Sequence, residues 1–379
     1  MIPGLENYHG REQSFIKHLF LTQYLQSAAY KILQSRSPIF NFVDAFAGPW
    51  RVLDEKYSDA SFNQALTTLE SVRAALGRSG VAGLRIRFCF CERQIGPFTQ
   101  LCQYADKHKQ FDIRVFHGSF EDRLRDIADV CRDGFTFTFI DPTGWNIRSE
   151  PILEFLRDRK GEFLLNFMAE HVNRHAEYSN VAASFGRFLA DPDWADEFNN
   201  LPVDWTNETR VLYLLRRKIK AMGAATYLPD FPILKPREQR VKMRLLLGTH
   251  SAKGLEVFRD VQAAVELREI ETRGRLRNEG GDQVSLFSED VIAAMQQDVA
   301  GIGCSSFRQE AQTRIVTQLT NSGPLTFSQL FINVLENVPI RATQIKALVN
   351  AMKERGIITF ELPPRKRVPQ LDTIISLHH

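Results

Sequence analysis

Short apolar segments alternate with helix-length segments over the first half of the chain, and this alternation constrains the fold more than any other feature. The apolar segments cover 39–45, 84–91, 112–116, 135–141 and 162–168. Helical patterns lie between them at about 61–76, 95–109, 120–132 and 150–159. Such alternation predicts a mostly parallel β-sheet with helices on both faces, and near-continuous apolar strands fit burial on both faces.

Two further strand candidates follow a helical insertion. The insertion covers residues 171–222, and the strand candidates at 225–234 and 240–249 are joined by a polar turn around Pro236. A hairpin of this kind is the usual end of a doubly wound sheet that binds S-adenosylmethionine (SAM). We therefore expect an α/β fold with a Rossmann-like doubly wound sheet of the class I methyltransferase type.

The C-terminal residues have the pattern of a separate domain. Residues 271–290 are polar and aperiodic, which is typical of a linker. Beyond them, three helical patterns are followed by two short strands joined by the basic turn PPRKRVP, which is the winged-helix order. The predicted parts are an N-terminal helical segment (1–36), the sheet domain (37–270), a linker (271–300) and a winged-helix-like domain (301–379).

Charge is distributed unevenly along the chain. Residues from 301 onward carry nine Lys or Arg and five Asp or Glu, a net charge of +4, whereas the whole chain carries +3. Arg365, Lys366 and Arg367 in the basic turn are therefore the predicted nucleic-acid contacts, with DNA as the expected polymer.

Composition excludes several classes of protein. No apolar run approaches the roughly 18 residues that a membrane-spanning helix needs, and the first residues lack the apolar region of a secretory signal. None of the five cysteines forms a C-x-x-C pair, so the spacing indicates no metal site, and Cys89 and Cys91 are expected to be buried strand thiols. We expect a cytoplasmic protein without a membrane partner.

The first motif with chemical potential follows the first predicted strand. The segment Asp44-Ala-Phe-Ala-Gly-Pro-Trp50 lies where a doubly wound sheet opens its ligand crevice. Small residues there allow the backbone to approach a cofactor, so Asp44, Phe46, Gly48 and Pro49 are predicted to bind SAM. The alternative is a tight turn in which Asp44 caps local amides.

Two more candidate cofactor contacts follow the next strands. Glu92 ends the second strand, where a carboxylate commonly accepts both ribose hydroxyls; the alternative is a solvated charge. Ser119 and Phe120 follow the third strand beside the expected adenine position. This cluster is equally typical of a helix N-cap, and both interpretations stay open.

The segment Asp141-Pro-Thr-Gly-Trp145 follows the fourth strand. Enzymes that methylate amino groups of nucleic acids carry an acid-Pro-Pro-aromatic loop here, whose polar group binds the amine while the ring stacks on a flipped base. Asp141 and Trp145 are the predicted catalytic residues, although Gly144 interrupts the motif. The alternative is a β-turn with Trp145 packed against the sheet.

Smaller features carry less weight. Lys17 and His18 on the first helix are more simply a solvated pair than crevice residues, and His250 is more simply a structural histidine. Asn166 and Arg174 either flank the crevice or hold loop backbone.

A short peptide in the predicted linker suggests a partner. Gln283-Val-Ser-Leu-Phe287 resembles the peptide with which bacterial proteins bind the replicative sliding clamp. The alternative is that this segment pins the linker to a domain surface.

Taken together, these segments resemble the three-Cys-motif partner (TcmP) family. The resemblance rests on FVDAFAGP (42–49), CFCE (89–92), FTFIDPTGW (137–145), LLNFM (164–168) and GTHSAKGLEVFRD (248–260), together with Lys17-His18. It implies a class I methyltransferase-like fold, a bacterial or phage setting near DNA-related functions, and a radical-SAM-like partner protein.

The resemblance also bears on site residues. It implies that Asp44, Gly48, Glu92 and Asp141 line the ligand crevice. The chain departs from the family at Trp50, where Gly is usual, and at Asp59–Phe62, where a Gly-Ser-Pro-like segment is usual. Trp50 either narrows the mouth of the cofactor site or stacks on a base.

Three functions remain open on this basis. The first is a SAM-dependent methyltransferase acting on nucleic acid, which makes an enzyme possible without establishing one. The second is a non-catalytic Rossmann-like module that associates with DNA. The third is a metal-dependent nuclease, whose candidate carboxylates are those of Asp44, Glu92, Glu121, Asp122 and Asp141.

Overall fold

The computed structural model describes residues 4–35, 37–48, 57–145, 147–170, 172, 182–279, 304–362 and 364–378. The chain divides into two compact units. The sheet unit comprises Met1–Leu228 and Pro232–His250, and the C-terminal unit comprises Pro229–Phe231 and Ser251–His379.

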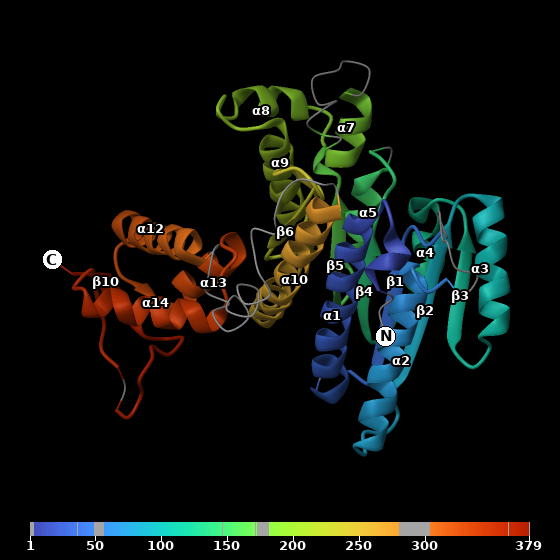
Figure 1. Ribbon diagram of the computed structural model, residues 1–379, viewed down its shortest axis with the longest axis horizontal. Coiled ribbons are helices and arrows are strands. Elements are labelled where there is room, and N and C mark those ends of the chain that lie inside the picture. The colour runs from blue at the N-terminus through green and yellow to red at the C-terminus, as the bar shows by residue number, and fades with distance from the viewer. Residues whose placement is uncertain are drawn as a thin grey trace. The chain divides into compact units, whose positions relative to one another are not determined.

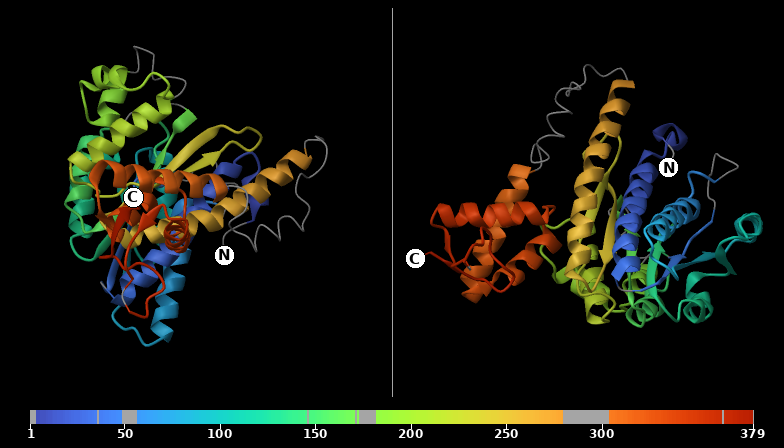
Figure 2. Two further views of the ribbon diagram at one scale, coloured as in Figure 1. Left: turned by 90° about the vertical axis from the view of Figure 1, so that its left-hand side faces the viewer. Right: turned by 90° about the horizontal axis from the view of Figure 1, so that it is seen from below.

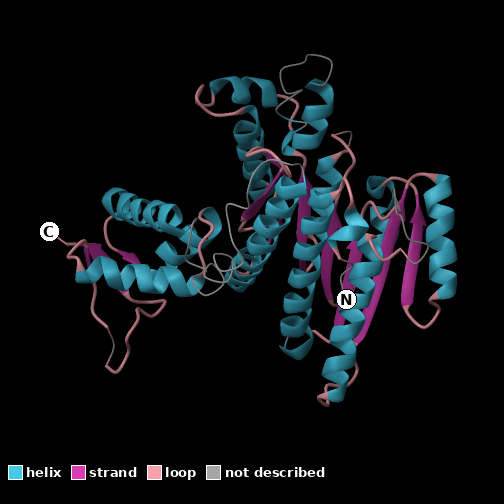
Figure 3. Ribbon diagram, in the orientation of Figure 1, coloured by secondary structure: helices cyan, strands magenta, loops and turns pink. Residues whose placement is uncertain are grey.

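A mostly parallel sheet of seven strands organises the described part of the sheet unit (Figures 1 and 3). Its strands are β1 (Ile39–Asp44), β2 (Arg85–Glu92), β3 (Asp112–His117), β4 (Phe135–Ile140), β5 (Gly161–Phe167), β6 (Asp230–Leu234) and β7 (Val241–Gly248). Their order in the sheet is β3-β2-β1-β4-β5-β7-β6. Strands β1 to β5 pair in parallel, and β7 pairs antiparallel with β5. This order and the antiparallel β7 are those of the class I methyltransferase type of Rossmann-like fold, as the sequence predicts.

The two central strands are buried along their whole length. Every residue of β1 and β4 is buried, which explains why both read as continuous apolar runs. Phe42 of β1 stacks on Phe137 of β4, with ring centroids 6.3 Å apart. By contrast, every residue of the edge strand β3 is exposed or half-buried, and its sequence is correspondingly more polar.

Helices cover both faces of the sheet (Figure 2, right). The helices between the strands are α1 (Glu12–Ser35), α2 (Ser61–Arg78), α3 (Ile95–Lys107), α4 (Phe120–Val130) and α5 (Ser149–Arg157). Tyr24 of α1 contacts Phe137, and Phe62 of α2 contacts Phe90, so these two helices cover one face. Cys89 and Cys91 point to the other face, where both are fully buried in a cluster with α4 and α5, as expected from the sequence.

The expected helical insertion is present between β5 and β6. In the described residues it contains α7 (Ala182–Leu189), α8 (Trp194–Asn200) and α9 (Asn207–Ala221). Its apolar side chains, including Phe185 and Leu212, join the same buried cluster as α4 and α5. The insertion therefore extends the core on that face of the sheet.

The C-terminal unit is mainly helical, with a small antiparallel sheet. Its elements are α10 (Ala252–Glu279), α12 (Cys304–Ser322), β8 (Leu325–Thr326), α13 (Phe327–Asn337), α14 (Ala342–Glu354), β9 (Ile358–Thr359) and β10 (Ile374–Leu377). The sheet order is β8-β10-β9. The three helical patterns and the final hairpin lie where the sequence places them.

One helix boundary differs from the sequence-based expectation. The helix expected to end near residue 268 continues to Glu279, so α10 covers the start of the predicted linker. Its last turns are rich in Arg, Leu and Glu, which favour helix, and the single Gly274 costs only about 1 kcal/mol there. Because residues 271–279 are polar and lack an apolar period, the sequence pattern indicates a linker there and not a helix.

No helix in the described ranges is both long and apolar enough to cross a membrane.

A buried arginine joins two helices of the C-terminal unit. Arg259 of α10 is 2% exposed. Its Nε donates to the carbonyl of Leu335 at 2.7 Å and its Nη2 to that of Glu336 at 2.8 Å, in the last turn of α13. Its Nη1 donates to the carbonyl of Asp230 at 3.0 Å and to Gln262 at 2.5 Å. A guanidinium at a helix C-terminus satisfies carbonyls that lack helical partners.

Replacing this guanidinium should loosen the C-terminal unit. We expect Arg259→Met to lower the free energy of unfolding by about 3 kcal/mol, because several buried carbonyls lose their donor. Chemical denaturation and hydrogen exchange of α13 would measure the effect. Arg268→Met is the matched control, since Arg268 lies on the same helix with its side chain 59% exposed. Equal stability of the two variants would contradict a structural role for Arg259.

Candidate functional site

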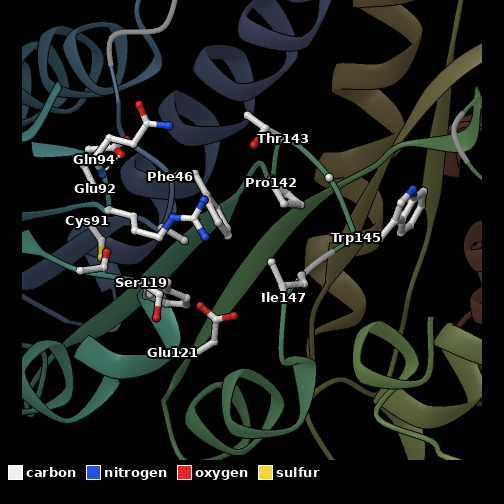
Figure 4. A pocket seen from close by; sticks show the side chains of 15 residues that line it. Phe46, Cys91, Glu92, Gln94, Ser119, Glu121, Pro142, Thr143, Trp145 and Ile147 are labelled. Atoms are coloured by element: carbon white, nitrogen blue, oxygen red, sulfur yellow. Dashed lines mark hydrogen bonds between the residues drawn. The ribbon is translucent and has the colours of Figure 1, made fainter. Parts of the chain in front are cut away.

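A cavity of about 220 Å³ opens at the carboxyl ends of the first four strands (Figure 4). Its walls are the end of β2 with the two residues after it (91–94) and the segments that follow β1 (45–46), β3 (118–121) and β4 (142–145 and 147). The carboxyl edge of a doubly wound sheet is where such folds bind ligands. Of the predicted cofactor and catalytic residues, the cavity brings together Phe46, Glu92, Ser119, Phe120 and Trp145.

Glu92 is the buried carboxylate of this cavity. It ends β2 and is 4% exposed, which rules out the alternative of a solvated charge. One of its oxygens, Oε1, accepts a hydrogen bond from the backbone N–H of Gln94 at 2.6 Å. A carboxylate offers about four acceptor positions, so further donors can bind Glu92 from the cavity.

Ser119 and Phe120 belong both to the cavity wall and to the start of α4. Ser119 is the N-cap of the helix, and its hydroxyl accepts from the backbone N–H of Asp122. The ring of Phe120 is 1% exposed and packs edge-to-face on Phe155, so it supports the wall from the core. The preceding Gly118 has φ +139°, and a Cβ there would lie 3.0 Å from Arg123, so glycine fits this turn best.

Asp44, the last residue of β1, does not line the cavity. It is fully buried, and Ser61 Oγ donates to its Oδ2 at 2.7 Å while the backbone N–H of Phe46 donates to its Oδ1 at 3.2 Å. Asp44 therefore caps a local amide, as the alternative interpretation of this motif predicts. Burial raises the pKa of Asp44 to about 7, although the two hydrogen bonds act in the opposite direction.

Asp141 is held from two sides at the end of β4. Lys17 Nζ on α1 lies 2.5 Å from Asp141 Oδ2, and Asn166 Nδ2 on β5 donates to Oδ1 at 2.6 Å. Burial favours the neutral carboxyl group, but the Lys17 ammonium and these hydrogen bonds outweigh it and hold the pKa of Asp141 below its ordinary value. Asp141 is therefore an oriented anion, and about a fifth (22%) of its side chain stays exposed.

The expectation that Lys17 and His18 form a solvated pair is wrong. Lys17 is 8% exposed and His18 is 7% exposed. The ring Nδ1 of His18 lies 3.0 Å from the hydroxyl of Tyr8, which also contacts Gln64. Burial and the neighbouring Lys17 lower the pKa of His18 to about 3, so this imidazole is neutral.

The sequence contains a signal for the burial of Lys17 that residue type alone conceals. Phe20, Leu21, Tyr24 and Leu25 lie at helical spacings from it and are all buried. A lysine within such a stripe needs an anionic partner, because an unpaired buried charge is costly.

The half-buried ring of Trp145 packs against the protein core. It stacks on Phe185 at 5.2 Å between ring centroids and contacts Phe188 edge-to-face at 4.6 Å. The indole points away from Glu92 and Ser119 (Figure 4). This is the packed arrangement of the alternative interpretation, so stacking of Trp145 on a flipped base would require the ring to leave its phenylalanine neighbours.

The remaining predicted residues are less informative. Gly48 is half-buried and does not line the cavity, and Pro49, Trp50, Arg174 and Gln283–Phe287 lie outside the described residues. His250 is exposed, with its Nδ1 2.8 Å from the hydroxyl of Thr226. In the C-terminal unit, the β9–β10 connection exposes Arg365, Lys366 and Arg367.

The carboxylates proposed for a nuclease do not form a metal site in the described part of the chain. Among those residues, no three His, Cys, Asp or Glu side chains lie close enough to hold one ion. Asp141 instead pairs with Lys17, and Asp122 pairs with Arg148 at 2.5 Å. In the described residues, these carboxylates are therefore held by separate partners.

No family model matches the sequence, and no curated protein matches it significantly. A putative methyltransferase, yhhF from Escherichia coli, aligns at 12% identity over 60% of this chain and 86% of its own, with a TM-score of 0.27. PKMT2 from Rickettsia typhi aligns at 10% identity over 93% and 94%, with a TM-score of 0.31. A loganic acid methyltransferase with SAH aligns at 8% identity over 75% and 88%, with a TM-score of 0.30. Because these TM-scores are low, the fold assignment rests on the strand order.

The raised pKa of Asp44 should make stability depend on pH. The folded chain holds a proton on Asp44 up to about pH 7, whereas the ordinary pKa of the group is 3.8. The stabilising contribution of protonation is therefore fully present below pH 3.8 and is lost as pH rises through 7. The stability of the wild type relative to Asp44→Asn should fall between these limits, by at most about 1.4 kcal/mol per pH unit.

Urea denaturation of both proteins between pH 5 and 8 would measure this difference. Asp129→Asn is the control, because the Asp129 side chain is 69% exposed. A difference between wild type and Asp44→Asn that stays constant with pH would show that Asp44 is ionised throughout.

Proposed function

We propose that the sheet unit binds SAM and that the chain is a SAM-dependent methyltransferase acting on nucleic acid. The observation that carries this proposal is the buried carboxylate of Glu92, which faces a cavity at the carboxyl ends of β1 to β4. The strand order of the sheet supports it. Both features depend on the chain's own residues and not on similarity to any other protein.

The residues present fit the adenosyl part of the cofactor. Glu92 would accept the two ribose hydroxyls, and the backbone around Ser119 would lie beside the adenine. Phe46 and Pro142 supply apolar walls. A volume of about 220 Å³ is below the roughly 300 Å³ minimum of typical small-molecule sites, so we assign this cavity to the nucleoside part alone.

Asp141 is the residue best placed to orient the acceptor. SAM supplies the methyl group when it is bound. The two oxygens of Asp141 are fixed by Lys17 and Asn166, and their remaining lone pairs can accept N–H groups of an amine. Because its pKa is lowered, Asp141 is a weak base, so its contribution is to position the nucleophile.

The proposal extends to the partners. The order α12-β8-α13-α14-β9-β10 supports a winged-helix assignment for the C-terminal unit, in which Arg365, Lys366 and Arg367 would contact DNA phosphates. The sequence resemblance to the TcmP family supports a radical-SAM-like partner protein in a bacterial or phage system. The peptide Gln283–Phe287 is a candidate contact with a sliding clamp.

A specific observation favours a second candidate function. Trp145 is packed against Phe185 and Phe188, and both oxygens of Asp141 already have partners. A non-catalytic, DNA-associated module would retain these contacts as purely structural ones. The two candidates differ in whether a methyl group is transferred.

Substitution of Glu92 tests whether the cavity binds SAM. We expect SAM to bind the full chain in calorimetry, and Glu92→Gln to weaken binding at least about tenfold, because each lost charge-assisted hydrogen bond is worth about 1.5–3 kcal/mol. Glu154→Gln on α5 is the matched control, since it is exposed and does not line the cavity. Absence of SAM binding by the wild type would refute the proposal.

Catalysis can be tested on Asp141. We expect Asp141→Asn to bind SAM normally but to transfer labelled methyl groups to DNA about 100-fold more slowly, because an amide orients an amine less well than a carboxylate. Incorporation of label from SAM into DNA would measure the rate. If SAM binds but neither the wild type nor the variant transfers label to DNA or RNA, the non-catalytic candidate is supported instead.

A further inference from the structure

The hairpin between β6 and β7 is strongly basic. Within the ten residues 235–244 the chain carries five cations and one acid, a net charge of +4. The cations are Lys235, Arg237, Arg240, Lys242 and Arg244, and the acid is Glu238. We refer to residues 235–244 as the basic hairpin. Its tip, residues 237–240, is exposed throughout.

Strand pairing places the basic hairpin on the same edge of the sheet as the cavity. Phe167, at the carboxyl end of β5, pairs with Arg244 in the antiparallel β7. Since β5 runs parallel to β4 and β1, the start of β7 and the turn before it lie at the carboxyl edge. Glu92 and Asp141 lie at that same edge.

A buried carboxylate holds two of the cations side by side. Glu170, which follows β5, is 3% exposed. Its Oε1 lies 3.0 Å from Lys235 Nζ, and its Oε2 accepts from Lys242. Burial opposes ionisation, but the two lysines lower the pKa of Glu170 to about 2, so it is an anion at all relevant pH values. Each ammonium has three N–H donors, and Lys242, with 33% of its side chain exposed, retains donors for another ligand.

The two arginines of the tip are available to a ligand. The Arg240 side chain is 56% exposed and meets Glu238 only at 3.9 Å. Arg237 is exposed and has no ion-pair or hydrogen-bond partner within the described ranges. A guanidinium matches the geometry of a phosphate group, with two parallel N–H donors.

We propose that the basic hairpin binds the phosphate backbone of the nucleic-acid acceptor and sets its position relative to Asp141. This inference rests on the proposed function, since it identifies where the acceptor polymer lies. The link to Asp141 is short, because Asn166 of β5 donates to Asp141 and pairs in register with Leu245 of β7. The sheet itself therefore fixes the spacing between the phosphate contacts and the residue that orients the amine.

The composition of the hairpin surface favours nucleic acid over a protein partner. The large exposed apolar side chains of the described chain are those of Ile95, Val203, Tyr213, Ile270, Leu371 and Ile374, and none belongs to the basic hairpin. A protein interface normally needs an apolar or aromatic centre. Binding to a phosphate backbone needs only cations that replace condensed counterions.

The test compares charge reversal at two edges of the same sheet. Arg237→Glu/Arg240→Glu alters the basic hairpin, and Arg78→Glu/Arg132→Glu is the control, because Arg78 ends α2 and Arg132 precedes β4, at the opposite edge. Fluorescence anisotropy of the full chain with labelled 20-nucleotide single-stranded and 20-base-pair duplex DNA, over a salt series, gives the affinity. We expect the hairpin variant to lose about 2 units of slope of log K against log salt, and the control to lose none.

The outcomes separate this inference from the proposed function. Calorimetry with SAM on the same variants measures binding at the cofactor site. Because no residue of the basic hairpin lines that cavity, the affinity for SAM should be unchanged. Equal DNA affinity and salt slope in the hairpin and control variants would overturn the inference, even if SAM binds. Loss of DNA binding only on neutralising Arg365, Lys366 and Arg367 would overturn it too. Competition by polyglutamate as effective as that by DNA would indicate an acidic protein partner instead.

Discussion

The parallel pairing of β1 with β2 on one side and with β4 on the other determines where the candidate site lies. Every residue of β1 and β4 is buried. Phe137 of β4 packs against Tyr24 of α1, and Phe90 of β2 packs against Phe62 of α2. Because the strands run in the same direction, the residues that follow them meet at one edge. Asp44, Glu92 and Asp141 are far apart in sequence, yet they share this edge for that reason alone. The cavity is a consequence of the sheet.

The acidic side chains at this edge differ in their neighbours, and their protonation differs accordingly. Lys17 keeps Asp141 ionised, whereas at Asp44 burial outweighs the hydrogen bonds from Ser61 and Phe46 and the more distant charge of Lys17, and raises the pKa. Glu170 holds two lysines together in the basic hairpin. Two carboxylates at the ends of neighbouring strands thus differ in protonation near pH 7.

Much of the fold was predictable because burial imposes a period on the sequence. The five apolar runs, the final hairpin of the sheet and the helix order of the C-terminal unit are all present. The continuation of α10 to Glu279 was missed because its residues are polar, although they favour helix.

The sequence predicts where the site lies, but it does not predict which side chains contact one another there. The strand-end motifs identified Glu92, Ser119 and Phe46 as cavity residues. They did not reveal the ion pair between Lys17 and Asp141, since partners 124 residues apart leave no local pattern. The sequence leaves both stacking and packing open for Trp145, because its contacts with α7 depend on an insertion that follows it in the chain. The sequence predicts only a polar turn at the basic hairpin. The pairing of β7 with β5 is what shows that the hairpin lies at the carboxyl edge of the sheet.

The central claim is that the cavity at the carboxyl edge holds the nucleoside part of SAM. A crystal structure of the full chain with S-adenosylhomocysteine tests it most directly. The account predicts both ribose hydroxyls about 2.5–3.0 Å from the carboxylate oxygens of Glu92, with the adenine beside Ser119. A ligand bound elsewhere, or an empty cavity at saturating ligand concentration, would contradict the claim.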